Sequence, residues 1–201
     1  MSKTELDTER NATSSHCIPH YRGQAPFTAP LDMTAWNLLV ARAQQWAIDR
    51  EFLQGATHIG QTMKLLEELG EFVANYNRGK DCKDDLGDML VVCAVLQLLE
   101  RGKPALLMAD IVPTETCNVY TAESRLELML YYIQQMLAGK RADGSPANPD
   151  AVSTLTVELA RSLGYNPVDC LWHAYNEIKD RTGRMMNGKF VKSADMAINQ
   201  L

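Results

Sequence analysis

The stretch from Met89 to Leu96 constrains the fold of this chain more than any other feature. Every residue in it is apolar. A helix that is apolar on all sides must be buried on all sides, and this run is far too short to cross a bilayer. We therefore predict a helix that begins between Asp81 and Asp84 and is enclosed by other helices.

Apolar residues also recur with the i, i+3, i+4, i+7 spacing of helices in the flanking segments. They predict helices over about 34–53, 57–76, 122–138, 149–164 and 167–183. The last two begin alike, since Asn148-Pro149 and Asn166-Pro167 each place an N-cap Asn before a Pro suited to the first helical position. Strand-like alternation is scarce, so the predicted fold class is all-α, a helical bundle.

The predicted helix over 57–76 carries two apolar stripes and a polar one. The first apolar stripe consists of Ile59, Met63, Leu66, Gly70 and Val73. The second widens it with Leu65, Leu69, Phe72 and Tyr76. The polar stripe consists of Gln61, Lys64, Glu68, Glu71 and Asn75.

Length and composition fit one domain. The chain has 201 residues, of which 46% are hydrophobic, enough for a packed core. We expect a loosely structured N-terminal arm over 1–30 and a single all-α domain over 31–201. An irregular insertion is expected near 103–120, with a short extended piece within it.

Charge and cysteine content argue against several classes of protein. The formal net charge of −5 does not suit a protein that coats nucleic acid, which usually carries a basic patch. The five cysteines are dispersed and form no C-x-x-C pair, so neither a disulfide framework nor a zinc site is indicated. The first ten residues lack the apolar core of a signal peptide. We predict a cytoplasmic protein with no membrane and no nucleic-acid partner.

Two acid pairs flank the turn between the predicted helix over 57–76 and the apolar helix that begins between Asp81 and Asp84. The first is E-E-L-G-E, with Glu68 and Glu71, and the second is D-D-L-G-D, with Asp85 and Asp88. Residues three apart share a helix face, so the two acids of each pair can point the same way. Carboxylate oxygens converging from two helices are the ligands that a hard cation such as Mg²⁺ prefers.

Each pair alone has an ordinary explanation, except at Asp88. Acids such as Glu68 and Glu71 usually face water on a helix surface, and Asp85 suits the positive end of a helix dipole. Asp88 lies about a turn inside its helix, directly before the buried run. A buried carboxylate needs a cation or a proton. If the two helices pack antiparallel, a divalent ion between them would offset the repulsion among the four acids.

Other metal and phosphate sites fit the sequence less well. A di-iron bundle site uses Glu-x-x-His on two helices, and no histidine of this chain follows a Glu by three residues. His58 and His173 are expected at a helix start or on the surface. No Gly-rich loop of the P-loop type is present, so phosphate chemistry would depend on a metal and side chains.

The two acid motifs resemble the MazG-like branch of the all-α nucleoside triphosphate pyrophosphohydrolases, a superfamily that includes the dimeric dUTPases. Its signature is Glu-x-x-Glu on one helix and Glu-x-x-Asp on the next. This chain has Asp85 where the family usually has Glu, so a bridging water or Asp84 would complete the coordination there. The resemblance covers about 58–100 and extends to the Asn/Lys/Arg-bearing segment 175–181.

The resemblance implies a reaction and a set of roles. The reaction is Mg²⁺-dependent hydrolysis of a nucleoside triphosphate between the α and β phosphates, to a monophosphate and pyrophosphate, with Mn²⁺ as a substitute ion. Metal ligands would be Glu68, Glu71, Asp85 and Asp88. Either Glu67 or Glu68 would orient or deprotonate the attacking water. Substrate contacts would come from His58, Gln61, Lys64, Asn176, Lys179 and Arg181.

Two further expectations concern assembly and an alternative function. The all-round apolar helix and the resemblance both favour a homodimer or homotetramer that completes the site. A non-catalytic, metal-stabilised helical module that binds a nucleotide or a protein partner is the alternative. Trp36, Trp46 and Trp172 have the spacing of core residues, with stacking on a base as the other possibility for one of them.

Overall fold

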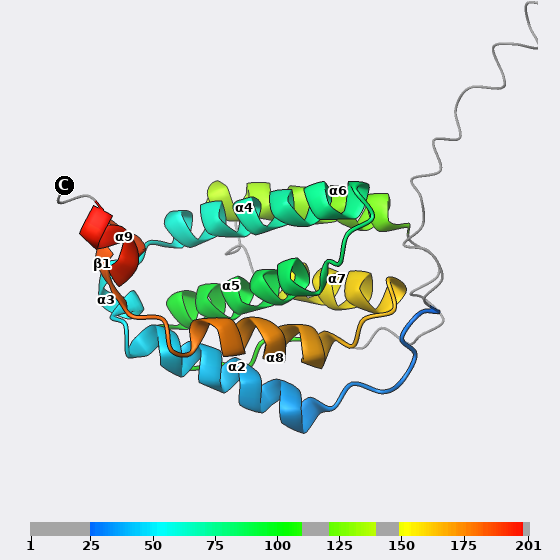
Figure 1. Ribbon diagram of the computed structural model, residues 1–201, viewed down its shortest axis with the longest axis horizontal. Coiled ribbons are helices and arrows are strands. Elements are labelled where there is room, and N and C mark those ends of the chain that lie inside the picture. Colours follow the sequence, from blue (N-terminus) through cyan, green and yellow to red (C-terminus); the bar gives the residue numbers. More distant parts are fainter. Residues whose placement is uncertain (1–24, 110–120, 140–148, 199–201) are drawn as a thin grey trace, which may run out of the picture.

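The computed structural model describes residues 25–109, 121–139 and 149–198, and most of these residues are helical (Figure 1). This confirms the predicted all-α class. No helix in the described ranges is long and apolar enough to cross a membrane. The elements in chain order are α2 (Met33–Ile48), α3 (Phe52–Gly55), α4 (His58–Asn77), α5 (Lys83–Arg101), α6 (Ala122–Leu137), α7 (Pro149–Ser162), α8 (Pro167–Ile178), β1 (Gly183–Met186), β2 (Lys189–Lys192) and α9 (Ser193–Ile198).

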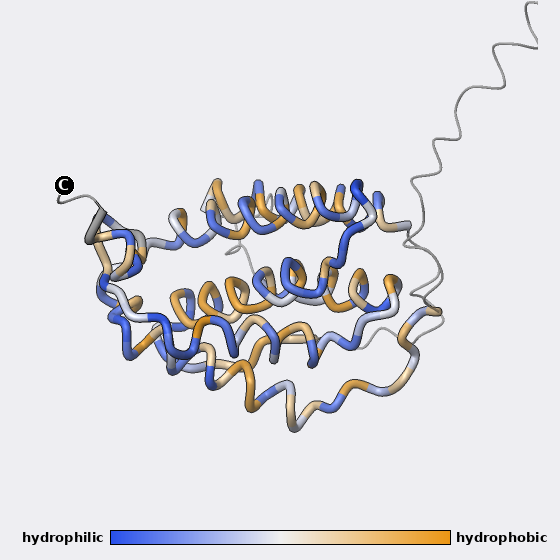
Figure 2. Tube along the Cα trace, in the orientation of Figure 1, coloured by the Kyte–Doolittle hydropathy of each residue, from blue (hydrophilic) through white to orange (hydrophobic). Residues whose placement is uncertain are grey.

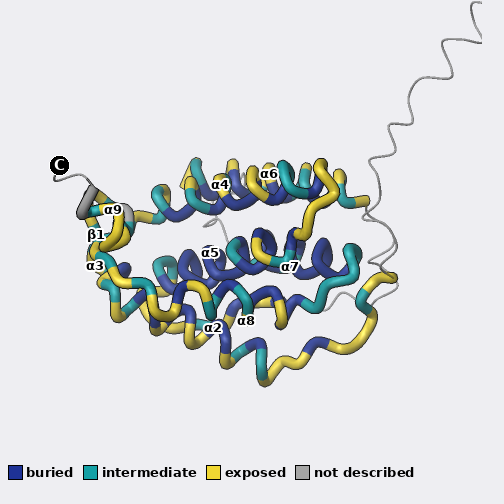
Figure 3. The backbone as a smooth tube through the Cα atoms, in the orientation of Figure 1, coloured by how far each residue is buried: buried dark blue, intermediate teal, exposed yellow. Residues whose placement is uncertain are grey.

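Helix α5 is the buried centre of the bundle, as its apolar run predicted. Together with α7 it lies between α4 and α6 on one side and α2 and α8 on the other, and α4 and α5 run in opposite directions (Figure 1). Every residue from Met89 to Leu98 is buried (Figure 3). The apolar residues of α5 stand out in Figure 2. Because burial of one large aliphatic side chain contributes about 1.5–3 kcal/mol, α5 anchors the core.

The start of α8 has the cap that its sequence predicted. The Asn166 side chain accepts a hydrogen bond from the Val168 N–H at 3.0 Å, and Pro167 occupies the first turn. Helix α7 likewise begins at Pro149, whereas its predicted cap, Asn148, lies outside the described residues.

The helix predicted over 34–53 is in fact two helices. Helix α2 ends at Ile48, and α3 begins at Phe52 after a turn in which Glu51 has φ +62°. A positive φ at a residue other than Gly, Asn or Asp has no sequence signature. The helical spacing of the apolar residues therefore predicted one continuous helix.

The last predicted helix also ends early. Helix α8 stops at Ile178, and Gly183 begins an antiparallel hairpin of β1 and β2. Its turn is Asn187-Gly188, with φ of +51° and +80°, which matches the positive-φ requirement of tight hairpin turns. The two strands and α9 were not predicted.

The hairpin is held against the bundle by aromatic packing. Phe190 of β2 contacts Trp46 and Phe52, with each pair of ring centroids 5.6 Å apart. Of the other two tryptophans, Trp36 is fully buried, as predicted, whereas Trp172 is 45% exposed and does not belong to the core.

The two apolar stripes of α4 have different environments. Leu65, Leu69, Phe72 and Tyr76 are buried in the core. In the other stripe Ile59, Met63 and Gly70 are exposed, with Ile59 59% and Met63 50% exposed, whereas Leu66 and Val73 are partly buried against the core. The stripe that we expected only to widen the apolar face is therefore the more deeply buried of the two.

Helices α5 and α8 pack closely at Gly87. A Cβ at this position would overlap the Cys170 carbonyl oxygen and lie 2.9 Å from the Ala174 Cβ. Gly70, the equivalent residue of the other acid motif, would have no such neighbour within 4 Å. The two glycines therefore differ in role, since Gly87 permits close helix packing whereas Gly70 is exposed.

The N-terminal segment contacts α7 of the same chain over its described residues. The Phe27 N–H donates to the Arg161 carbonyl oxygen at 2.9 Å, and the Arg161 guanidinium donates to the Ala29 carbonyl oxygen. Residues 1–24 of the predicted arm and 110–120 of the predicted insertion lie outside the described residues. Residues 105–109 are non-helical, as expected.

Gly87→Ala should destabilise the protein, because the new methyl group would overlap the α8 backbone. We expect the free energy of unfolding to fall by about 1–3 kcal/mol or more, measured by urea denaturation. Gly70→Ala is the matched control, and it should leave stability unchanged or raise it by up to about 1 kcal/mol. Equal effects of the two substitutions would contradict the close α5–α8 packing.

Candidate functional site

Asp88 lies where three elements meet. Its carboxylate interacts electrostatically with Glu68 and Lys64 of α4, with Asp84 of its own helix and with Arg181, which follows α8. Burial raises the pKa of Asp88 to about 7, and the negative charges of Glu68 and Asp84 add to this effect. Arg181 and Lys64 lower the pKa but do not offset the increase. This carboxyl group therefore lacks sufficient positive charge around it.

Glu68 is buried beside a lysine. Its carboxylate accepts from Lys64 Nζ at 2.6 Å, and the same ammonium contacts Glu67 at 3.0 Å. Burial raises the pKa of Glu68, and the nearby Glu71 adds to the rise, while the Lys64 hydrogen bond opposes it without cancelling it. The Glu67 side chain is 58% exposed, so the two neighbouring glutamates have distinct environments.

Asp85 is buried and held by a residue that we did not predict. The Asn75 amide donates to both carboxylate oxygens of Asp85, at 3.0 Å each. Burial raises the pKa of Asp85, the Asn75 hydrogen bonds lower it, and Asp84 and Glu71 raise it further. Asn75 belongs to the polar stripe of α4, but its partner could not be identified before the turn between α4 and α5 was known.

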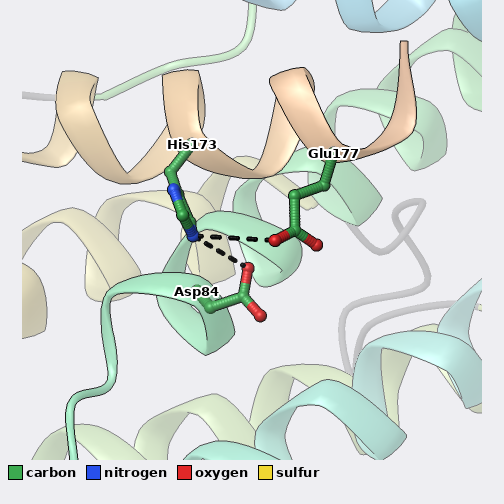
Figure 4. A group of neighbouring side chains, drawn as sticks. All are labelled: Asp84, His173 and Glu177. Atoms are coloured by element: carbon green, nitrogen blue, oxygen red, sulfur yellow. Dashed lines mark ion pairs between the residues drawn. The ribbon is translucent and has the colours of Figure 1, made fainter. Parts of the chain in front are cut away.

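The predicted ligands form one electrostatic cluster between α4 and α5. Glu71 is exposed, and its charge raises the pKa of both Glu68 and Asp85. The side chains do not form a compact ligand group in this conformation. In the described part of the chain, the group whose ligand atoms all lie within 4.8 Å of one another is Asp84, His173 and Glu177 (Figure 4).

The predicted substrate-binding residues come from the first half of α4 and from the C-terminal end of α8 with the segment that follows it, which lie toward the same end of the bundle (Figure 1). Gln61 is buried. Burial also lowers the pKa of His58, and the negative charge of Glu100 offsets part of this decrease. Near the end of α8, the Lys179 ammonium donates to the Asn176 side chain at 3.0 Å, and Arg181 contacts Glu177 at 3.3 Å.

Arg50 fixes the segment that carries Lys179 and Arg181. Its guanidinium donates to the Arg181 carbonyl oxygen at 2.8 Å and to the Lys179 carbonyl oxygen at 3.1 Å. The same group lies over the Trp46 ring, 4.7 Å from its centroid. Arg50 thus caps the C-terminal end of α8, where cations are favoured, and positions two candidate phosphate contacts.

The donor set fits a hard divalent cation. Glu68, Glu71, Asp85 and Asp88 offer only carboxylate oxygens, which Mg²⁺ prefers. Burial is the main cause of the raised pKa values of Glu68, Asp85 and Asp88, and the negative charges of nearby acids add to it without full compensation. A bound cation would remove that deficit.

Comparison with known proteins identifies a partial relative. The chain is 37% identical over 60 residues to an uncharacterised 18.2 kDa protein from the rep-hol intergenic region of Haemophilus phage HP1. The match covers 29% of this chain and 37% of the phage protein. No protein-family model and no solved structure matches the chain.

With divalent ions removed by a chelator, the free energy of unfolding should fall as the pH rises from 3.8 to about 7. In this range folded Asp88 keeps a proton that the unfolded chain has lost, so the folded state binds more protons and becomes less stable with rising pH. Each unit of pKa difference corresponds to about 1.4 kcal/mol.

Urea denaturation across this pH range measures the decline. Asp88→Asn should remove most of it, whereas Asp169→Asn, a change of an exposed acid on α8, should not. An equal decline in wild type and Asp88→Asn would show that another group is responsible.

Proposed function

We propose that the protein hydrolyses nucleoside triphosphates between the α and β phosphates, in a Mg²⁺-dependent reaction that yields a monophosphate and pyrophosphate. The observation that carries this proposal is the position of Asp88, a partly buried acid with its pKa raised to about 7. It has acids of both motifs beside it and two cations, Lys64 and Arg181, within electrostatic reach.

Glu68, Glu71, Asp85 and Asp88 would hold the ion, with Mn²⁺ as a substitute. When bound, Mg²⁺ supplies neutralisation of phosphate charge and lowers the pKa of a coordinated water. Asp85 already accepts two hydrogen bonds from Asn75, which favours contact through a water. This arrangement would accommodate the shorter side chain.

The remaining residues would bind and orient the substrate. Exposed Glu67 or buried Glu68 would accept a proton from the attacking water. Arg181 and Lys179, held by Arg50, would contact the phosphates, Arg being suited to bidentate contacts. Lys64, His58, Gln61 and Asn176 complete the proposed set of contacts.

Trp172 is the tryptophan that would stack on a base. Its side chain is 45% exposed, and it lies one helical turn before Asn176 on the same face of α8. An aromatic ring provides a stacking surface for any base, so this contact alone would not select among nucleotides.

A panel of ribo- and deoxyribonucleoside triphosphates incubated with Mg²⁺ tests the proposal. We expect monophosphate and pyrophosphate from at least one of them, resolved by chromatography. Glu71→Gln and Asp88→Asn should each lower turnover more than about 100-fold, with unchanged helicity by circular dichroism. Glu127→Gln, which alters an exposed acid on α6, should leave turnover unchanged.

Two results would contradict the enzyme proposal. Full activity in both variants would show that the metal is not held by these acids. Binding of triphosphates without any turnover would favour the alternative, a metal-stabilised module that binds a nucleotide or a protein partner.

A homodimer or homotetramer remains part of the proposal, but exposed apolar side chains on α4, rather than the apolar surface of α5, now support it. Helix α5 finds its packing partners within the chain, so its apolar surface no longer requires a second copy. The exposed Ile59 and Met63 on α4 are the side chains that self-association would cover.

Light scattering at micromolar concentration should give at least twice the chain mass of 22.5 kDa. Met63→Glu should lower that mass, because it places a charge in the contact. Glu127→Gln serves as the matched surface control. A monomer in the wild-type protein would refute the assembly.

A further inference from the structure

Three side chains from two helices converge beside the cluster described above. His173 Nε2 lies 3.7 Å from Asp84 Oδ1 and 3.8 Å from Glu177 Oε1 (Figure 4). Asp84 belongs to the first turn of α5, and the other two residues belong to α8. The three side chains are 43–52% exposed, so an ion from solution can reach them.

The spacing of these atoms is close to that around a single metal ion. Hydrogen bonds from a ring nitrogen to a carboxylate are about 2.7–3.2 Å long, so these contacts are too long for good hydrogen bonds. Ligands about 2.1 Å from a tetrahedral Zn²⁺ lie about 3.4 Å from one another. The two distances from His173 Nε2 exceed this separation by 0.3 and 0.4 Å, and the ligand atoms of all three residues lie within 4.8 Å of one another.

The backbone holds the three residues in this relation. His173 and Glu177 are four residues apart on α8, which places them on one face. Gly87 sets the close approach of α5 to that helix, one turn after Asp84. The group therefore depends on the helix packing rather than on a loop.

Glu177 can bind an ion without losing its other partner. Its Oε1 faces His173, whereas its Oε2 accepts from Arg181 at 3.3 Å. The two oxygens of one carboxylate thus serve two neighbours, and Arg181 would act as the outer partner that orients a coordinating carboxylate.

We propose that Asp84, His173 and Glu177 form a binding site for a transition-metal ion such as Zn²⁺ or Co²⁺, separate from the carboxylate site for Mg²⁺. An imidazole nitrogen selects Zn²⁺, Co²⁺ or Ni²⁺ over Mg²⁺, which suits oxygen ligands. Three protein ligands leave a coordination position for water or for an external ligand. The site does not depend on the proposed hydrolysis.

The proposal is tested by Co²⁺ titration of the full-length protein in excess Mg²⁺. The visible absorption of Co²⁺ reports its ligands directly, without any assay of activity. We expect saturable binding to the wild-type protein, with the intensity typical of low coordination number. His173→Asn should weaken binding at least about tenfold, whereas Asp169→Asn, which alters an exposed acid of the same helix, should have no effect.

The double variant Glu71→Gln/Asp88→Asn separates this site from the proposed Mg²⁺ site. It should bind Co²⁺ as the wild type does, even if it has no hydrolytic activity. Binding that survives His173→Asn, or that is lost in the double variant, would overturn the proposal. Circular dichroism of each variant verifies that the comparison is made between folded proteins.

Discussion

The close approach of α5 to α8 at Gly87 is the constraint on which the rest of the site depends. Because no side chain separates the helices there, the first two turns of α5 lie directly beside α8. Asp84 consequently reaches His173, and Asp88 comes within the electrostatic influence of Arg181. On the other side, the short turn after α4 brings Asn75 to Asp85. Packing of the central helix therefore positions both groups of acids.

The same packing makes the site electrostatically costly. A carboxylate at the edge of an apolar helix loses hydration, and neighbouring acids add repulsion. Lys64 offsets part of the charge at Glu68, and Asn75 supplies hydrogen bonds to Asp85, yet the pKa of each acid stays raised. Acids with such pKa values in a shared location are typical of functional sites. A divalent cation is the simplest species that would stabilise this arrangement.

How far the sequence predicts the structure depends on the kind of residue. The burial of α5 and the cap at Asn166-Pro167 were predictable from local sequence. A helix that is apolar on all sides must be buried, and Asn followed by Pro is typical of a helix start. The core face of α4 was not, since both of its stripes are apolar and only tertiary packing chooses between them. Glu51 and the hairpin strands carry weak local signals. His173 and Glu177 have the i, i+4 spacing of a paired ligand set, but their link to Asp84 depends on the contact at Gly87.

The position of a bound ion is the measurement that tests the central claim most directly. Anomalous diffraction from crystals grown with Mn²⁺ in place of Mg²⁺ would locate it. Our account predicts a peak between α4 and α5, within coordination distance of the carboxylates of Glu68, Glu71 and Asp88. A structure with Mn²⁺ bound elsewhere and no peak between these helices, under conditions that support turnover, would contradict it.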